Sequence, residues 1–254
     1  MKKILHLERL AVLAFILLTG MFCNAQPVLT ENFDYANGTL LTAAGWSAHS
    51  GPGTQAVDVV VPGLSFTGYG LSNIGGAARI DNNGEDVNRT FAVQSSGTVY
   101  AAFLVNVASL VDGYFLHLGG DPISTIFRAK LFTAGTADPF NFGISVGANT
   151  ATTVSGGAFN LNKTYLLVIK YEVIDGTTND KVSLFVFSGA IPATEPATPS
   201  VGPLTDATMS DINPGSIALR QFSASQNILV DGIRIGKTWA EAVTTTSTAD
   251  VTPP

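Results

Sequence analysis

The stretch "TVYAAFLVNVASL", Thr98–Leu110, is apolar at both its odd and its even positions. Successive side chains of a strand point to opposite faces, so this pattern predicts a central β-strand that is covered on both sides. A helix is disfavoured by the valine content and by Gly97 and Gly113 at the ends of the stretch. The stretch therefore predicts a sheet with packed layers on both faces.

Shorter runs of the same character lie on both sides of it. Thr164–Val173 and Asp180–Phe187 are separated by the polar turn "IDGTTN", which predicts a hairpin. Roughly a dozen such runs occur without a helical spacer, and each ends in Gly, Pro or Asn. This organisation predicts an all-β fold of two packed antiparallel sheets, a jelly-roll β-sandwich.

The two ends of the chain differ from this pattern. Residues 1–25, "MKKILHLERLAVLAFILLTGMFCNA", combine basic residues, an apolar run and small residues at Ala25, which predicts a secretory signal peptide. The apolar run Leu10–Phe22 is shorter than the ~20 residues of a spanning helix. We expect a secreted or cell-surface protein without membrane association after signal removal. The sandwich domain is expected over residues 26–240, and residues 241–254 as a Thr/Pro-rich tail before a further C-terminal module.

The charge of the chain excludes several partners. It has 13 Lys/Arg and 19 Asp/Glu, and the signal removes three basic residues and one acidic residue, which leaves 10 − 18 = −8. Such an acidic chain repels phosphate backbones and anionic membranes, so nucleic acid is not expected as a partner. The single cysteine, Cys23, lies in the signal, so no disulfide is expected.

Several stretches carry a resemblance to a known family. They are "ENFDYANGTLLTAAGW", "GEDVNRTF", "VYAAFLVNV", "YFLHLG", "FRAKLF", "IALRQ" and "VDGIRIGKTW". Over Thr30 to Ala240 the sequence resembles the concanavalin A-like lectin/glucanase jelly rolls of exported multi-module proteins from Bacteroidetes-type bacteria. The resemblance implies that fold, and export as cargo of a type IX secretion system.

Catalytic patterns of that fold are not found in the sequence. β-Glucan-cleaving members use Glu-x-Asp-x-x-Glu on one strand, whereas the pair Glu85-Asp86 would point to opposite faces of a strand and is interpreted as a solvated strand entry. Alginate lyase-type members need an Arg-rich strand, Gln-x-His and a Tyr, and His117 lacks that Gln. We therefore interpret His117 as a strand histidine that is satisfied by backbone, and we expect no enzyme.

The leading hypothesis is a non-catalytic extracellular recognition module that binds carbohydrate or a cell-surface polymer. The alternatives are a structural spacer or adhesion domain, and a diverged polysaccharide-active hydrolase or lyase, which an Arg-His-Tyr cluster would favour. Aromatic side chains stack on sugar rings, and the candidates are Trp46, Tyr69 and Tyr114. Because basic residues are few, we expect such binding to depend on stacking rather than on charge.

A carboxylate interrupts the last strand-like stretch, "NILVDGIRIG", Asn227–Gly236. Alternation places Asp231 on the apolar face, with Leu229, Ile233 and Ile235. A bulge at Gly232 would turn Asp231 outward. Alternatively, an arginine pairs with it, and the candidates are Arg89, Arg128 and Arg220. The third hypothesis is a structural Ca²⁺ held by Asp34 and Asp231, whose strands would pair; no other cofactor is expected.

Overall fold

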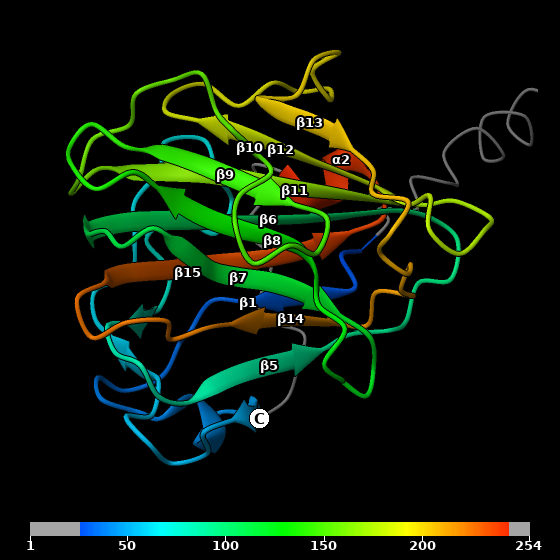
Figure 1. Ribbon diagram of the computed structural model, residues 1–254. Coiled ribbons are helices and arrows are strands. Elements are labelled where there is room, and N and C mark those ends of the chain that lie inside the picture. Colours follow the sequence, from blue (N-terminus) through cyan, green and yellow to red (C-terminus); the bar gives the residue numbers. More distant parts are fainter. Residues whose placement is uncertain (1–25, 244–254) are drawn as a thin grey trace, which may run out of the picture.

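Figure 1 shows the computed structural model, which describes residues 26–243 as two packed antiparallel sheets. The eight-stranded sheet has the order β13-β12-β11-β6-β15-β4-β3, with β1 also paired to β15. Its strands are β1 (Leu29–Glu31), β3 (Asp58–Val60), β4 (Ala77–Ile80), β6 (Gly97–Ser109), β11 (Thr164–Val173), β12 (Lys181–Phe187), β13 (Val201–Leu204) and β15 (Asn227–Gly236). The all-β jelly-roll sandwich predicted from the sequence is confirmed.

The seven-stranded sheet has the order β10-β9-β8-β7-β14-β5-β2. Its strands are β2 (Ser47–Ser50), β5 (Asp86–Thr90), β7 (Gly113–Gly119), β8 (Arg128–Ala134), β9 (Asn141–Ser145), β10 (Thr153–Val154) and β14 (Ser216–Leu219). Two short helices, η1 (Leu41–Ala43) and α2 (Trp239–Val243), complete the elements of the described range. Within that range, the helices are too short and too polar to cross a membrane.

The predicted central strand is β6, which pairs with β11 on one side and β15 on the other. Its side chains alternate between two apolar layers, as predicted: Phe103 and Val105 belong to the core between the sheets, whereas Leu104 belongs to a second cluster on the outer side. The predicted hairpin is β11–β12, with Leu166 opposite Phe187 at its open end.

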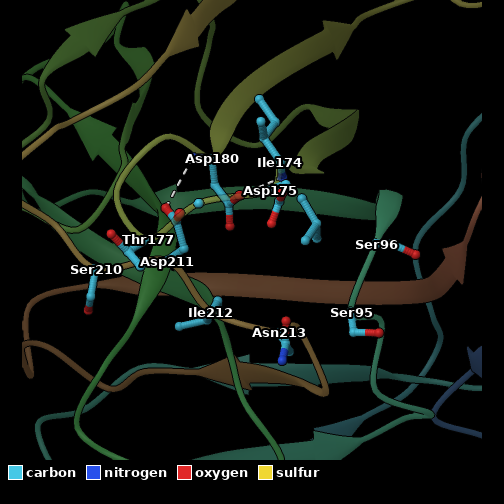
Figure 2. A pocket seen from close by; sticks show the side chains of 12 residues that line it. Ser95, Ser96, Ile174, Asp175, Thr177, Asp180, Ser210, Asp211, Ile212 and Asn213 are labelled. Carbon is cyan, nitrogen blue, oxygen red and sulfur yellow. Dashed lines mark hydrogen bonds between the residues drawn. The ribbon is translucent and has the colours of Figure 1, made fainter.

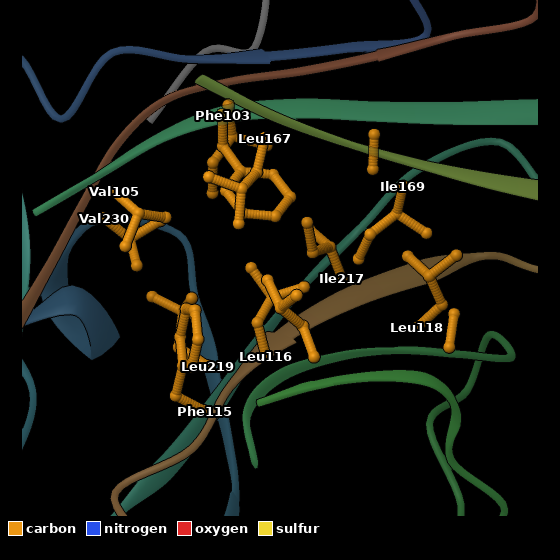
Figure 3. Close-up of a cluster of buried hydrophobic side chains, with 14 of the residues drawn as sticks. Phe103, Val105, Phe115, Leu116, Leu118, Leu167, Ile169, Ile217, Leu219 and Val230 are labelled. Carbon is orange, nitrogen blue, oxygen red and sulfur yellow. The ribbon is translucent and has the colours of Figure 1, made fainter. Parts of the chain in front are cut away.

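The main core lies between the two sheets (Figure 3). Side chains from β6, β11 and β15 face those from β7 and β14; they are Phe103, Val105, Leu167, Ile169 and Val230 on one side and Phe115, Leu116, Leu118, Ile217 and Leu219 on the other. Apolar area that is removed from water contributes about 25 cal/mol per Å². This layer therefore supplies stability that the domain cannot gain from disulfides.

The chain itself covers the outer face of the eight-stranded sheet. A second apolar cluster there includes Leu64, Phe66 and Leu71 from the segment between β3 and β4, and Trp239 and Val243 from α2. Packing thus extends to Val243, three residues past the expected domain end. The expected signal peptide and residues 244–254 of the expected tail lie outside the described residues.

Candidate functional site

Tyr114 and His117 both lie on the outward face of the seven-stranded sheet, although they are three residues apart on β7. Their neighbours Phe115, Leu116 and Leu118 belong to the core between the sheets. A regular strand cannot give this pattern, because residues three apart point to opposite faces. The pairing of β7 with β8 shifts register between Tyr114 and Leu116, and this irregularity brings Tyr114 and His117 to one side.

Arg220 directly follows β14, the neighbour of β7, and its guanidinium packs against two aromatic rings. Its Cζ lies 4.0 Å from the ring centroid of Tyr114 and 4.5 Å from that of Phe222. Gly113 makes room for Phe222, because a Cβ at this glycine would clash with that ring. A stacked guanidinium keeps the N–H groups of its edge directed at acceptors in its own plane.

Lys130 lies on β8, on the other side of β7. Its Nζ is 4.7 Å from the Tyr114 ring centroid and donates a hydrogen bond of 2.7 Å to Asn149 Oδ1. Burial, followed by the positive charges of Arg220 and Arg128, lowers the pKa of Lys130 to about 8. Tyr114 is therefore flanked by two cationic side chains on the neighbouring strands.

Three side chains next to this group carry buried polar atoms that form no hydrogen bond of normal geometry within residues 26–243. The atoms are His117 Nε2, Asn88 Oδ1 and both ring nitrogens of His49, and we call these residues the polar trio. Ala218 on β14 pairs with Asn88 on one side and with His117 on the other, and the two imidazole rings are 5.8 Å apart. Buried polar atoms without partners are rare in proteins, so this group requires an explanation.

Both histidines of the polar trio are uncharged at neutral pH. Burial lowers the pKa of His117 to about 3, with His49 as the next cause. Burial also lowers the pKa of His49, and a smaller effect of Asn88 opposes it. His117 Nδ1 lies 3.4 Å from the Leu118 carbonyl, so backbone satisfies only one of its nitrogens. A neutral imidazole offers one donor and one acceptor, and the trio is therefore a set of neutral hydrogen-bonding groups.

The acidic pair Glu85-Asp86 is not a solvated strand entry. Glu85 is 1% exposed, and its Oε2 accepts the N–H of Gly53 at 2.8 Å. Asp86 accepts the N–H of Gln221, next to Arg220. Burial raises the pKa of Asp86 to about 6, against the opposing effects of that hydrogen bond and of Arg220. Asp86 therefore adds a titratable group at the edge of the Tyr114 cluster.

A cavity of about 610 Å³ lies at the turn between β11 and β12 (Figure 2). Its buried carboxylates hold loops together: Asp211 accepts the N–H groups of Asn179 and Asp180, and Asp180 accepts the hydroxyl of Tyr171 and the N–H of Ile174. Over the described chain, no three His, Cys, Asp or Glu side chains gather as metal ligands would. We assign these carboxylates a structural role.

All three aromatic candidates are buried, and Tyr114, over which Lys130 and Arg220 lie, is 7% exposed. Trp46 is 3% exposed, stacks on Phe33 and donates its indole N–H to Glu31 at 3.1 Å. Tyr69 is 4% exposed and donates its hydroxyl to the Gly232 carbonyl at 2.7 Å. None of the three rings presents a free face to solvent, so the aromatic ring available for stacking on a sugar at this cluster is that of Phe222, which is 38% exposed. Phe222 was not among the candidates from the sequence, because its partner Gly113 is distant in the chain and no local pattern joins the two.

Asp231 lies at a bulge, as one of the three hypotheses held, but it is buried. Gly232 has a φ of +56° and the register of β15 shifts between Asp231 and Arg234. The bulge breaks the alternation: Val230 and Ile233 face the core between the sheets, whereas Asp231 reaches the covered outer face and accepts the Leu64 N–H at 2.6 Å. Burial raises the pKa of Asp231 to about 8.

The other two hypotheses for Asp231 were a pair with an arginine and a Ca²⁺ site shared with Asp34, and no contact among the described residues supports either. The three candidate arginines bind elsewhere: Arg89 pairs with Glu31, Arg128 with the backbone and hydroxyl of Ser210, and Arg220 with the aromatic rings. β1 and β15 do pair as expected, but Asp34 beyond β1 is exposed while Asp231 is buried. A Ca²⁺ shared by Asp34 and Asp231 stays a prediction.

Comparisons with known proteins place the fold. No protein-family model and no curated protein matches the chain. The PL-14 alginate lyase from Aplysia kurodai aligns with a TM-score of 0.51 at 10% identity over 83% of this chain and 99% of its own. A seed lectin of Lotus tetragonolobus gives 0.44 at 9% over 82% and 97%, and a GH131 β-glucanase catalytic domain of Podospora anserina gives 0.44 at 15% over 86% and 88%.

These matches correct the expectation that the chain is not an enzyme. A protein named as an enzyme, the alginate lyase, shares the architecture at 10% identity, so this fold does not exclude catalysis. The absence of known catalytic sequence patterns did not justify that expectation. The register shift in β7 brings together an Arg-His-Tyr group that no linear motif displays. The chain has the concanavalin A-like lectin/glucanase jelly-roll fold that the sequence resemblance predicted.

Proposed function

We propose that the outward face of the seven-stranded sheet binds carbohydrate, with Tyr114 at its centre. The observation that carries the proposal is the polar trio: His117, which lies beside Tyr114, and its neighbours His49 and Asn88 carry four buried ring and amide atoms that form no hydrogen bond of normal geometry within residues 26–243. A sugar offers hydroxyl groups that both donate and accept, and such groups match neutral imidazoles and an amide. The exposed ring of Phe222 provides the apolar surface on which a sugar ring stacks.

Two further observations support this proposal. The alginate lyase with the same fold is a carbohydrate-active protein by its name. The N-terminal sequence predicts a secretory signal, so we place the interaction outside the cell or on its surface, where polysaccharides are abundant. Export by a type IX route and a following C-terminal module belong to the same proposal. A spacer or adhesion domain without a small ligand is the alternative outcome of the test below.

The test is binding of the full chain to a panel of neutral and acidic polysaccharides. Phe222→Ala and Asn88→Ala should each weaken binding at least tenfold, which corresponds to about 1.4 kcal/mol. Leu40→Ala is the matched control, because Leu40 is an equally exposed apolar residue, 45% exposed, that makes none of the contacts described for the Tyr114 cluster. Absence of binding to every polymer, or equal loss in the control, would overturn the proposal.

A second candidate function, cleavage of the bound glycan, is favoured by the ionisation of two groups. The pKa of Lys130 is lowered to about 8 and that of Asp86 is raised to about 6, both mainly by burial. Groups that exchange protons near neutral pH are typical of general acid and base catalysts. Release of shorter or unsaturated products, lost in Asp86→Asn with binding retained, would establish it. Intact polymer after prolonged incubation would exclude it.

A further inference from the structure

We propose that the carbohydrate bound at this face is acidic and that Arg220 and Lys130 hold its carboxylate. The inference rests on the proposed function of the same face and adds the chemical class of its ligand. It departs from the expectation that binding would depend on stacking alone. The structure supplies three independent reasons: where the few cations gather, what they lack as partners, and how the guanidinium is held.

Cationic side chains are scarce in this chain, yet two of them lie against the same aromatic ring here. The chain has 13 Lys/Arg, of which three precede residue 26, and the net charge of the whole chain is −6. Lys130 Nζ lies 4.7 Å and Arg220 Cζ 4.0 Å from the ring centroid of the same residue, Tyr114. The charges of Arg220 and Arg128 also contribute to lowering the pKa of Lys130. Repulsion among like charges costs free energy in the folded state. In an acidic protein, such a local concentration of cations favours the binding of an anion.

Arg220 and Lys130 also lack carboxylate partners. Elsewhere in the chain, Arg79 pairs with Asp58 at 2.7 Å and Lys170 with Glu195 at 2.9 Å. Across residues 26–243, by contrast, no Asp or Glu oxygen lies within 4.0 Å of a charged nitrogen of Lys130 or Arg220. Asp86 interacts with the charge of Arg220 only at longer range, and it accepts a hydrogen bond from the backbone N–H of Gln221. A buried cation without a counter-ion is costly, and a bound carboxylate would remove that cost.

The guanidinium is oriented before any ligand arrives. The rings of Tyr114 and Phe222 both pack against the Arg220 guanidinium, and its Nη1 makes one long contact of 3.4 Å with the Tyr114 carbonyl. A planar guanidinium with its faces stacked presents its edge, which matches the two oxygens of a carboxylate. Lys130 Nζ donates to Asn149 and retains two further N–H groups.

The neighbouring groups favour an acidic sugar over other anions. The polar trio adds uncharged donors and acceptors, which suit hydroxyl groups rather than a second anionic group. The overall acidity of the chain opposes long anions such as nucleic acids. A sugar ring with one carboxylate, as in a uronate, matches the combination of two cations, an aromatic platform and neutral hydrogen-bonding groups.

The experiment compares binding of the full chain to polygalacturonate and to the same polymer after chemical reduction of its carboxyl groups. The two ligands differ only in charge. We expect polygalacturonate or alginate to bind at least tenfold more tightly than its reduced form, with affinity falling as salt increases. Equal binding of the reduced polymer would overturn this inference and leave the proposed function intact. Binding to dextran sulfate but not to uronates would overturn the carboxylate assignment, and absence of all binding would overturn both proposals.

Variants of Arg220 and Lys130 test whether these two side chains hold the carboxylate. Arg220→Gln and Lys130→Gln should each weaken uronate binding at least tenfold and bring the affinity for the uronate close to that of the same variant for the reduced polymer. Lys163→Gln is the matched control, because Lys163 Nζ lies over the Tyr165 ring at 5.5 Å in a similar cation–aromatic pair. Should a variant fail to fold, isotope-labelled lysine in the native chain gives the same answer: uronate should raise the pKa of Lys130. An unchanged pKa in the saturated complex would contradict the inference.

Discussion

The outward faces of the two sheets differ in how far the chain covers them and in whether their buried polar groups form hydrogen bonds. On the eight-stranded sheet the chain covers its own apolar surface with Leu64, Phe66, Trp239 and Val243. The polar group buried there, Asp231, is satisfied by backbone N–H groups of Leu64 and Gly232. On the seven-stranded sheet the corresponding face carries cations without carboxylate partners and the unsatisfied atoms of the polar trio. The chain covers the first face, whereas on the second face Phe127 stacks on His117 but leaves the polar atoms without hydrogen bonds of normal geometry, and this is where we propose that a ligand binds.

This difference separates stability from function. A covered face whose polar groups have partners contributes to the free energy of unfolding, and substitutions there should be destabilising. A face that holds unpaired cations and orphan polar atoms costs stability, and substitutions there should be neutral or stabilising while binding is lost. The following substitutions test this division, beginning with the largest expected effect.

Gly232→Val should damage the covered face most. Gly232 has a φ of +56°, and a Cβ there would lie 3.0 Å from Leu71 Cβ and 3.2 Å from Tyr69 Cε1. Left-handed strain and overpacking together should lower the free energy of unfolding by roughly 4 kcal/mol. Gly53→Val is the control, because Gly53 has a φ of +74° without neighbours within 4 Å, and strain alone should cost it about 2 kcal/mol. Equal losses in urea unfolding would show that the bulge is not tightly packed.

Asp231 should make the stability of the covered face depend on pH. Its pKa is raised from 3.8 to about 8, so the folded state binds the proton more tightly than the unfolded state. The stabilising contribution is therefore complete below the unfolded pKa and is lost as pH rises toward about 8. Asp231→Asn stays uncharged and should gain about 2 kcal/mol relative to the native chain between about pH 5 and pH 7. A constant difference across this range would contradict the assignment.

Lys130→Met should have the opposite character, because it removes an unpaired cation from the seven-stranded sheet. We expect the free energy of unfolding at neutral pH to rise by about 1 kcal/mol. The pKa of Lys130 is lowered from 10.5 to about 8, so the gain should be complete below about pH 8 and shrink as pH approaches 10.5. A stability loss at neutral pH would mean that Lys130 supports the fold rather than a ligand.

Calcium should have the smallest effect. Asp34 is exposed, and Asp231 is buried with a raised pKa that favours its protonated form, which is a poor ligand for Ca²⁺. Asp34→Asn should change the free energy of unfolding by less than about 0.5 kcal/mol. The melting temperature should be the same in calcium and in chelator. A rise with calcium that Asp34→Asn removes would restore the metal hypothesis.

The sequence predicts the elements whose pattern is regular and fails where the backbone departs from regularity. β6 and the β11–β12 hairpin follow from alternation and turn composition alone. In β15 alternation groups Asp231 with Ile233, but one residue in a left-handed conformation moves them to opposite faces. In β7 a register shift brings Tyr114 beside His117. Both irregularities depend on neighbouring strands, and one sequence does not encode such pairing locally.

The contacts of the candidate site have the same long-range origin. Arg220 lies 106 residues from Tyr114 in the chain, and β14 reaches β7 only because the sheet order is not the chain order. Because basic residues are few, the sequence led us to expect binding that does not depend on charge. Composition alone does not show that Lys130 and Arg220 lie at the same site. Tyr114 itself was a candidate because tyrosines stack on sugars, but its cationic neighbours became visible only in the sheet.

The most direct test of the account is the nuclear magnetic resonance of the histidine rings during titration with polygalacturonate. The chain has three histidines, so His49 and His117 can be assigned with single His→Gln variants. The account predicts that the ring signals of both shift as the polymer saturates the protein, while the indole signal of the buried Trp46 stays in place. Saturable binding that leaves both imidazoles unchanged would place the ligand elsewhere and contradict the central claim.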